Sequence, residues 1–212
     1  MARYRRRKRL PSTIRVPRYY RRHPLFVAVV LIIGFVAFLG RDAQRSPSAP
    51  VTGSDLDRYD GQTFTVVHVA DGDTVDVDAP DGNETKTRIR LWGVDTPETD
   101  KSPTGRMFYG DEASDFTRSA LLGRRVRLLL VADDTRDKYN RLLAYIVPVD
   151  TGRLFNEILV EAGYAYADPR FKHPHRERFL SLESNARAAR VGLWQSVTPD
   201  QMPNWRRRNA AK

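Results

Sequence analysis

Three acidic residues and two arginines in this sequence are of the types that bind a metal ion together with a phosphate group. The acids are Asp73, Asp95 and Glu98, and the arginines are Arg90 and Arg141. Carboxylate oxygens are the ligands that Ca²⁺, Mg²⁺ and Mn²⁺ prefer, and a planar guanidinium matches the oxygens of a phosphate. Each residue alone would also suit an exposed turn or a polar strand face. The prediction of a metal-and-phosphate site therefore depends on the fold bringing them together.

Two short strands carry Asp73 and Arg90, and Asp95 and Glu98 follow the second of them. Polar and apolar residues alternate over 73–78 and 85–92, as in strands that bury one face. The second strand must end in the turn around Pro97, because proline has no N–H and disfavours helical geometry in the residue before it. If the two strands are antiparallel neighbours, Asp73 at the start of one and Asp95 beyond the end of the other lie at the same rim.

The order of the predicted elements indicates an α+β fold. The remaining alternating patterns predict strands over 64–69, 125–131 and 142–147, and the helical patterns predict helices over 111–122, 154–162 and from about 174 to 192. Each helix is followed by a glycine, which can cap a carboxyl end. Five short strands with a helix between the third and fourth suit a Greek-key β-barrel of the OB type, covered by three helices.

The chain divides into five predicted regions. They are a basic arm over 1–24, an apolar helix over 25–40, a Ser- and Pro-rich linker over 41–60, the barrel domain over 61–195 and a basic tail over 196–212.

The apolar helix is slightly short for a bilayer, which needs about 20 residues, and a signal-peptide core is the main alternative. No small-x-small cleavage motif follows it, so we favour an uncleaved anchor in the lipid. The arginines before it then predict a cytoplasmic N-terminus and an extracytoplasmic domain. Cleavage would instead yield a secreted protein.

Net charge is concentrated at the two ends of the chain. Of the 36 basic residues, ten lie in 1–24 and four follow residue 204, so 25–204 carry 22 basic against 26 acidic groups. This body, with a net charge of −4, is not a broadly basic nucleic-acid binder. The absence of cysteine excludes disulfides, thiolate metal sites and cysteine nucleophiles.

Four motifs in register resemble the staphylococcal nuclease, or thermonuclease, family. They are DGDTV at 71–75, RLWGVDTPET at 90–99, YGDEASDFT at 109–117 and DKYNRLLAYI at 137–146, and the similarity runs from about residue 61 to 194. The resemblance implies an OB-fold, Ca²⁺-dependent, sugar-nonspecific nuclease that cuts DNA and RNA and leaves 3′-phosphates.

The resemblance also implies roles for individual residues. Asp73 and Asp95 match calcium carboxylates, Thr96 matches a residue that offers its backbone carbonyl to the metal, and Glu98 matches the acid that deprotonates the attacking water. Arg90 and Arg141 match the phosphate-clamping arginines, and Lys138 and Tyr139 match contacts to the nucleotide's other phosphate. None of these positions is substituted.

Some features stay open at this point. The family's base-flanking tyrosines have no clean match, and Tyr166 and Phe171 are candidates for that role. Trp205 beside three arginines could stack a base or pack against the domain. We interpret Asp71 and Asp76 as exposed turn acids. The alternative function is an OB-fold module that holds nucleic acid or protein without cutting.

Overall fold

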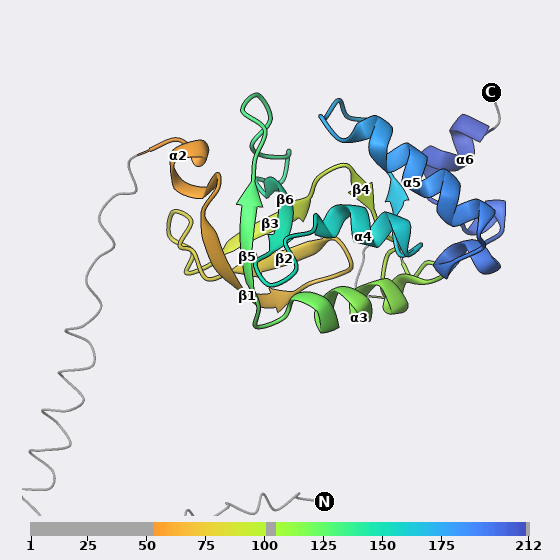
Figure 1. Ribbon diagram of the computed structural model, residues 1–212, viewed down its shortest axis with the longest axis horizontal. Helices are drawn as coiled ribbons and strands as arrows, with labels where there is room; N and C mark the ends of the chain where they lie inside the picture. Colours follow the sequence, from red (N-terminus) through yellow and green to blue (C-terminus); the bar gives the residue numbers. More distant parts are fainter. Residues whose placement is uncertain (1–52, 101–104, 211–212) are drawn as a thin grey trace, which may run out of the picture. The chain divides into compact units, whose positions relative to one another are not determined.

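The computed structural model describes residues 53–100 and 105–210. Five strands in this part of the chain form a closed barrel in the order β1-β2-β3-β6-β5 (Figure 1). The strands are β1 (Thr63–Val69), β2 (Thr74–Val77), β3 (Thr87–Leu91), β5 (Arg125–Leu129) and β6 (Leu142–Pro148). All neighbours are antiparallel except β3 and β6, which run parallel. The predicted five-stranded OB-type barrel is confirmed.

A bulge in β1 allows the barrel to close. Thr63–Thr65 pair with β5, and Val66, His68 and Val69 pair with β2, with a shift of register between Val66 and His68. An extra residue in one strand bends it and increases its twist. Strand β1 can therefore pair with β5 along its first part and with β2 along its second part.

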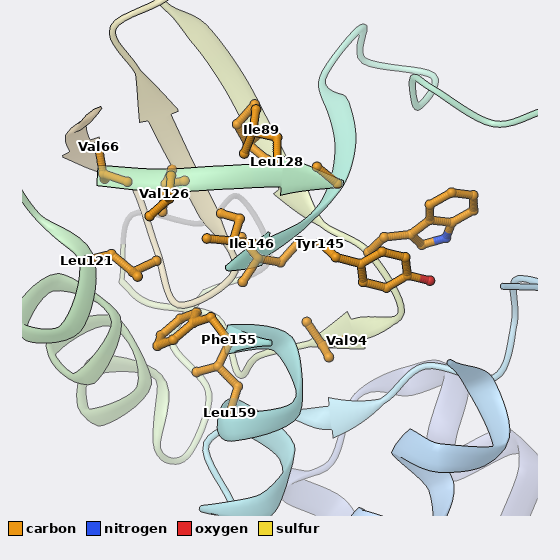
Figure 2. Close-up of a cluster of buried hydrophobic side chains, with 14 of the residues drawn as sticks. Val66, Ile89, Val94, Leu121, Val126, Leu128, Tyr145, Ile146, Phe155 and Leu159 are labelled. Atoms are coloured by element: carbon orange, nitrogen blue, oxygen red, sulfur yellow. The ribbon is translucent and has the colours of Figure 1, made fainter. Parts of the chain in front are cut away.

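Side chains from every barrel strand fill the interior. Val66, Ile89, Val126, Leu128 and Ile146 are fully buried, and Figure 2 shows them gathered between the strands. Leu121 of α3 (Gly110–Leu121) and Phe155 and Leu159 of α4 (Phe155–Glu161) join the same cluster. The apolar faces expected on these two helices therefore pack on the barrel.

A buried side-chain amide connects α4 to β6 and to the residue that follows β3. Asn156 has no exposed surface, its Oδ1 accepts from the Ile146 N–H at 3.0 Å, and its Nδ2 donates to the Trp92 carbonyl at 2.9 Å. Because buried backbone groups need partners, this side chain fixes the end of β3 against β6.

The third predicted helix is α5 (Arg176–Ala188), which packs on α4 (Figure 1). Several short elements were not predicted. They are α2 (Asp55–Tyr59), the paired strands β4 (Val94–Asp95) and β7 (Tyr166–Ala167), the 3₁₀ turns η2 (Gly192–Gln195) and η3 (Pro199–Gln201), and α6 (Asn204–Ala210). Tyr59 of α2 is buried in the main core although it lies in the range expected to be linker.

The expected single-pass membrane placement is corrected by the structure. Within residues 53–100 and 105–210 no helix has both the length and the apolar character to cross a bilayer. The longest, α5, has 13 residues and so measures about 20 Å, against a hydrocarbon core of about 30 Å. The predicted anchor over 25–40 lies outside the described residues.

Candidate active site

The register of β2 and β3 brings the first candidate pair to one rim of the barrel. The two strands are antiparallel with Thr74 opposite Arg90, and the Leu91 N–H donates to the Asp73 carbonyl at 2.8 Å. Asp73 is only 2% exposed, and its carboxylate forms an ion pair with Arg90 Nη1. The expectation that the two strands are antiparallel neighbours is confirmed.

A tight turn then returns the chain so that Asp95 also reaches Arg90. Gly93 stands at φ 75°, a left-handed conformation that favours glycine, and the ring of His173 covers it so closely that a Cβ would fall 2.5 Å from that ring. Arg90 Nη2 donates to Asp95 Oδ1 at 2.7 Å. One guanidinium therefore lies between two carboxylates from two sides of the turn.

Arg141 approaches the Asp73 carboxylate through a threonine. Its Nη1 donates to Thr74 Oγ1 at 3.4 Å, and that hydroxyl donates in turn to Asp73 Oδ1 at 3.2 Å. Asp137 holds the arginine from the other side, accepting from its Nε at 2.7 Å and from its backbone N–H at 3.0 Å. The two predicted arginines, 51 positions apart in the chain, therefore meet around Asp73.

Lys138 and Tyr139 lie at the exposed tip of the loop between β5 and β6. The Tyr139 ring is 67% exposed, with Lys138 Nζ 4.9 Å and Arg141 Cζ 5.4 Å from its centroid. Asp137 also accepts from the Tyr139 N–H at 2.9 Å. The loop thus presents a cationic and aromatic surface next to Arg141.

Glu98 is placed by the close contact of its backbone with the start of α3. The Met107 N–H donates to the Glu98 carbonyl at 2.9 Å, and a Cβ on Gly110 would lie 2.1 Å from that same oxygen. Only glycine allows this approach. Asp95, Thr96 and Glu98 line one cavity of about 770 Å³, so the third predicted acid opens on the same space as Asp95.

Two acids were interpreted wrongly from the sequence. Asp76 is fully buried and pairs with Lys86 and Arg88. Asp71 is half-buried, and its Oδ1 accepts from the Asp73 N–H at 3.1 Å. Burial raises the pKa of the Asp71 carboxyl, an effect that the charge of Arg90 opposes. Asp71 therefore belongs to the rim, and its spacing of two from Asp73 was the signal available.

The aromatic candidates for base contact separate clearly. Tyr166 has no exposed surface and packs edge-on against Trp194, so it cannot stack on a base in this structure. Phe171 is 54% exposed. Trp205, whose role was open, donates from Nε1 to Asp95 Oδ2 at 2.8 Å.

The donors at the rim suit a hard divalent cation. The described residues contain no group of three or more His, Asp or Glu side chains placed to hold a metal ion. Asp73 and Asp95 nevertheless share one positive charge between them, and the Thr96 N–H binds Asp73 Oδ2 at 2.7 Å, which brings the Thr96 backbone next to that carboxylate. Two carboxylates and a carbonyl are oxygen ligands of the kind that Ca²⁺ accepts, with water filling its remaining positions.

Comparison with known proteins agrees with this geometry. The family model described as staphylococcal nuclease homologue matches residues 88–196, just over half of the chain. The chain belongs to the staphylococcal nuclease family. A thermonuclease of Staphylococcus hyicus is 34% identical over 176 residues, covering 81% of this chain and 95% of the relative. A thermonuclease of Staphylococcus intermedius is 33% identical over 174 residues, with the same coverage.

An endonuclease of Bacillus subtilis is 33% identical over 135 residues, which cover 61% of this chain and 60% of the relative. Membership of the staphylococcal nuclease family makes this chain a nuclease, a hydrolase. The matched region contains both arginines, Asp95, Thr96 and Glu98, but begins after Asp73 and ends before Trp205.

Proposed function

We propose that this nuclease hydrolyses the phosphodiester bonds of both DNA and RNA, in a calcium-dependent reaction in which water is the nucleophile. The observation that supports this most is the placement of Arg90 between Asp73 and Asp95 at one rim of the barrel. A divalent cation can bind both carboxylates here, and Arg90 can contact a phosphate at the same place.

The residues divide the chemistry between them. Asp73 and Asp95, with the carbonyl of Thr96, would hold Ca²⁺, which when bound acts as a Lewis acid toward a phosphate oxygen. Arg90 and Arg141 donate to the phosphate oxygens and stabilise the negative charge that develops there. A guanidinium has five N–H groups, so each arginine can contact the phosphate and keep its carboxylate partner.

Glu98 is the proposed general base. It takes a proton from water as the water oxygen forms a bond to phosphorus. The bond from phosphorus to the 5′ oxygen breaks, and that oxygen takes a proton from the solvent. The products are a 3′-phosphate and a 5′-hydroxyl. Lys138 and Tyr139, on the loop beside Arg141, hold the neighbouring phosphate of the leaving nucleotide. All of the proposed contacts are to phosphate groups and none is to the sugar, so the enzyme does not distinguish DNA from RNA.

Digestion by the full chain tests this function. We expect cleavage of single-stranded DNA, duplex DNA and RNA with Ca²⁺, and none with a chelator. Arg141→Ala should lose at least about a thousandfold in kcat/KM, because an arginine that stabilises phosphoryl charge contributes about 10³–10⁵. Arg124→Ala is the matched control, since Arg124 forms an exposed pair with Asp150 beyond the far end of α3.

Two results would contradict the proposal. Binding of nucleic acid without cleavage in any divalent metal would favour the non-catalytic module instead. Wild-type rates from purified, folded Arg141→Ala would remove the assigned role of that arginine.

A further inference from the structure

The cavity of about 770 Å³ beside Asp95 and Glu98 has a second wall that the family match does not include. Residues 200–207, here called the C-terminal wall, line it through Trp205, Arg207 and neighbouring residues. The facing side comes from Arg106–Tyr109 and Glu112, and no residue of the 137–141 loop lines the cavity. The volume lies within the range of about 300–1,000 Å³ that small-molecule sites occupy.

Buried contacts hold the C-terminal wall in place. Arg206 forms two hydrogen bonds of 2.7 Å to the carboxylate of Glu183 on α5, a side chain that is almost fully buried, and Figure 1 shows α6 next to α5. Met202 and Trp205 pack on a second apolar cluster that contains Leu193 and Trp194. The wall is thus a built part of the domain.

The lining of the cavity has the chemistry that nucleotides require. Trp205 is partly exposed, its Nε1 bonds to Asp95, and Arg170 Cζ lies 4.5 Å from its ring centroid. Further arginines and aromatic rings in the lining are Arg106, Arg207, Phe108 and Tyr109, and its acidic residues are Asp95, Glu98, Glu112 and Asp200. Aromatic and guanidinium planes stack on bases, and arginine pairs with phosphate oxygens.

We propose that this cavity is a second nucleotide subsite, which takes the nucleotide on the 5′ side of the scissile phosphate, with Trp205 contacting its base. The side follows from the proposed function, on which the inference rests. Attacking water and leaving oxygen lie in line on opposite sides of phosphorus. The cavity contains Glu98, the proposed base, so the leaving 5′ oxygen and its nucleotide face away from it, toward Lys138 and Tyr139. The nucleotide that keeps the phosphate then occupies the cavity.

Cleavage of a labelled single-stranded oligonucleotide with one stable abasic residue tests this subsite. With the full chain and Ca²⁺, the rate at each linkage is read on a denaturing gel and compared with the intact oligonucleotide. Stacking of one base contributes about 1–3 kcal/mol, so the linkage whose 5′ neighbour lacks its base should be cut at least about fivefold more slowly. In Trp205→Ala this penalty should fall below twofold, and the penalty for a missing 3′ base should be unchanged.

Two further variants separate base contact from support of Asp95. Trp205→Phe loses the hydrogen bond to Asp95 but keeps a ring, so it should retain most of the 5′ penalty. Arg124→Gln, beyond the other end of α3, should behave as wild type. Equal 5′ penalties in wild type and Trp205→Ala, with both proteins folded by circular dichroism, would overturn the subsite while leaving the nuclease function intact.

The same oligonucleotides, measured by fluorescence anisotropy in chelator, distinguish the two proposals. If the wild-type chain cuts nothing, the proposed function fails. If the abasic oligonucleotide binds wild type more weakly than the intact one does, and this difference disappears in Trp205→Ala, the subsite would still be supported. If both proteins bind both oligonucleotides with equal affinity, the subsite would be overturned.

Discussion

Replacing Arg90 by glutamine should destabilise the protein by an amount that depends on calcium. Arg90 is the positive group that lies directly against both Asp73 and Asp95, and the Asp73 carboxylate is 2% exposed. Removing one partner of a buried ion pair costs about 3–5 kcal/mol, because the other charge stays buried without compensation. The Arg90 and Asp95 side chains keep 18% and 16% of their exposure, so we expect about 3 kcal/mol, the low end of that range.

Thermal unfolding of the full chain, followed by circular dichroism, measures this effect. For a domain of about 150 residues, 1 kcal/mol corresponds to about 2–4 °C in Tm, so Arg90→Gln should unfold about 6–12 °C below wild type in chelator. Saturating Ca²⁺ should reduce the difference to less than about 1 kcal/mol, because a cation that binds only the folded state stabilises it and replaces the missing charge between the carboxylates.

Arg141→Gln is the matched control for this prediction. Its partner Asp137 lies four residues away in a partly exposed loop, so the loss should stay below about 1 kcal/mol with or without calcium. Two results would contradict this prediction: Arg90→Gln in chelator as stable as wild type, or the same loss of stability with Ca²⁺ as without it. Either result would mean that Arg90 does not neutralise the two carboxylates.

Three other substitutions probe the supports of the site. Asn156→Leu removes both partners of buried backbone groups and should cost about 2–4 kcal/mol in urea unfolding; an unchanged midpoint would contradict the assigned hydrogen bonds. Gly110→Ala places a methyl group 2.1 Å from the Glu98 carbonyl oxygen and should lower kcat at least about tenfold with helix content unchanged, the expected cost of misplacing a catalytic group; wild-type kcat would show that this contact does not position Glu98. Burial lowers the pKa of His173 to about 4, so the folded state disfavours its protonation, and stability that is complete above pH 6.5 should be lost as pH falls toward 4. With allowance for partial exposure this loss is about 1–2 kcal/mol, and His173→Asn should show less of it in urea titrations at pH 7 and pH 4.5; parallel pH curves would refute the assignment.

The barrel strands and the three longer helices could be predicted because their signals are local. Alternation in β3 and the apolar stripe of α3 report which face each element buries, and burial of that face dominates their stability. The elements that escaped prediction are short. Strands β4 and β7 have two residues each, too few for a period to show, and they exist because Asp95 and Tyr166, 71 positions apart in the sequence, pair with each other.

In the candidate site, too, local signals predicted some residues and contacts between distant parts of the chain decided the others. Residue types and the Pro97 turn were sufficient to select Asp73, Asp95 and Glu98 as a group, and the structure places the first two around one arginine. Asp71 was missed because its one local signal, the spacing of two from Asp73, does not distinguish a half-buried aspartate from an exposed turn residue. What sets Asp71 apart is its burial and the charges of Arg90 on β3 and of Arg141 in the loop before β6.

The sequence by itself determined the family, the barrel and the oxygen and guanidinium groups available for chemistry, since side-chain type and period are properties of neighbouring residues. The tertiary structure alone decided that Tyr166 is sealed in the interior and that Trp205 reaches Asp95. The buried pair of Arg206 with Glu183 contributes to both, because it holds the last helix against the domain and places Arg206 Cζ 5.2 Å from the Tyr166 ring centroid. No local pattern reports such a contact, because its free energy comes from groups that only folding brings together.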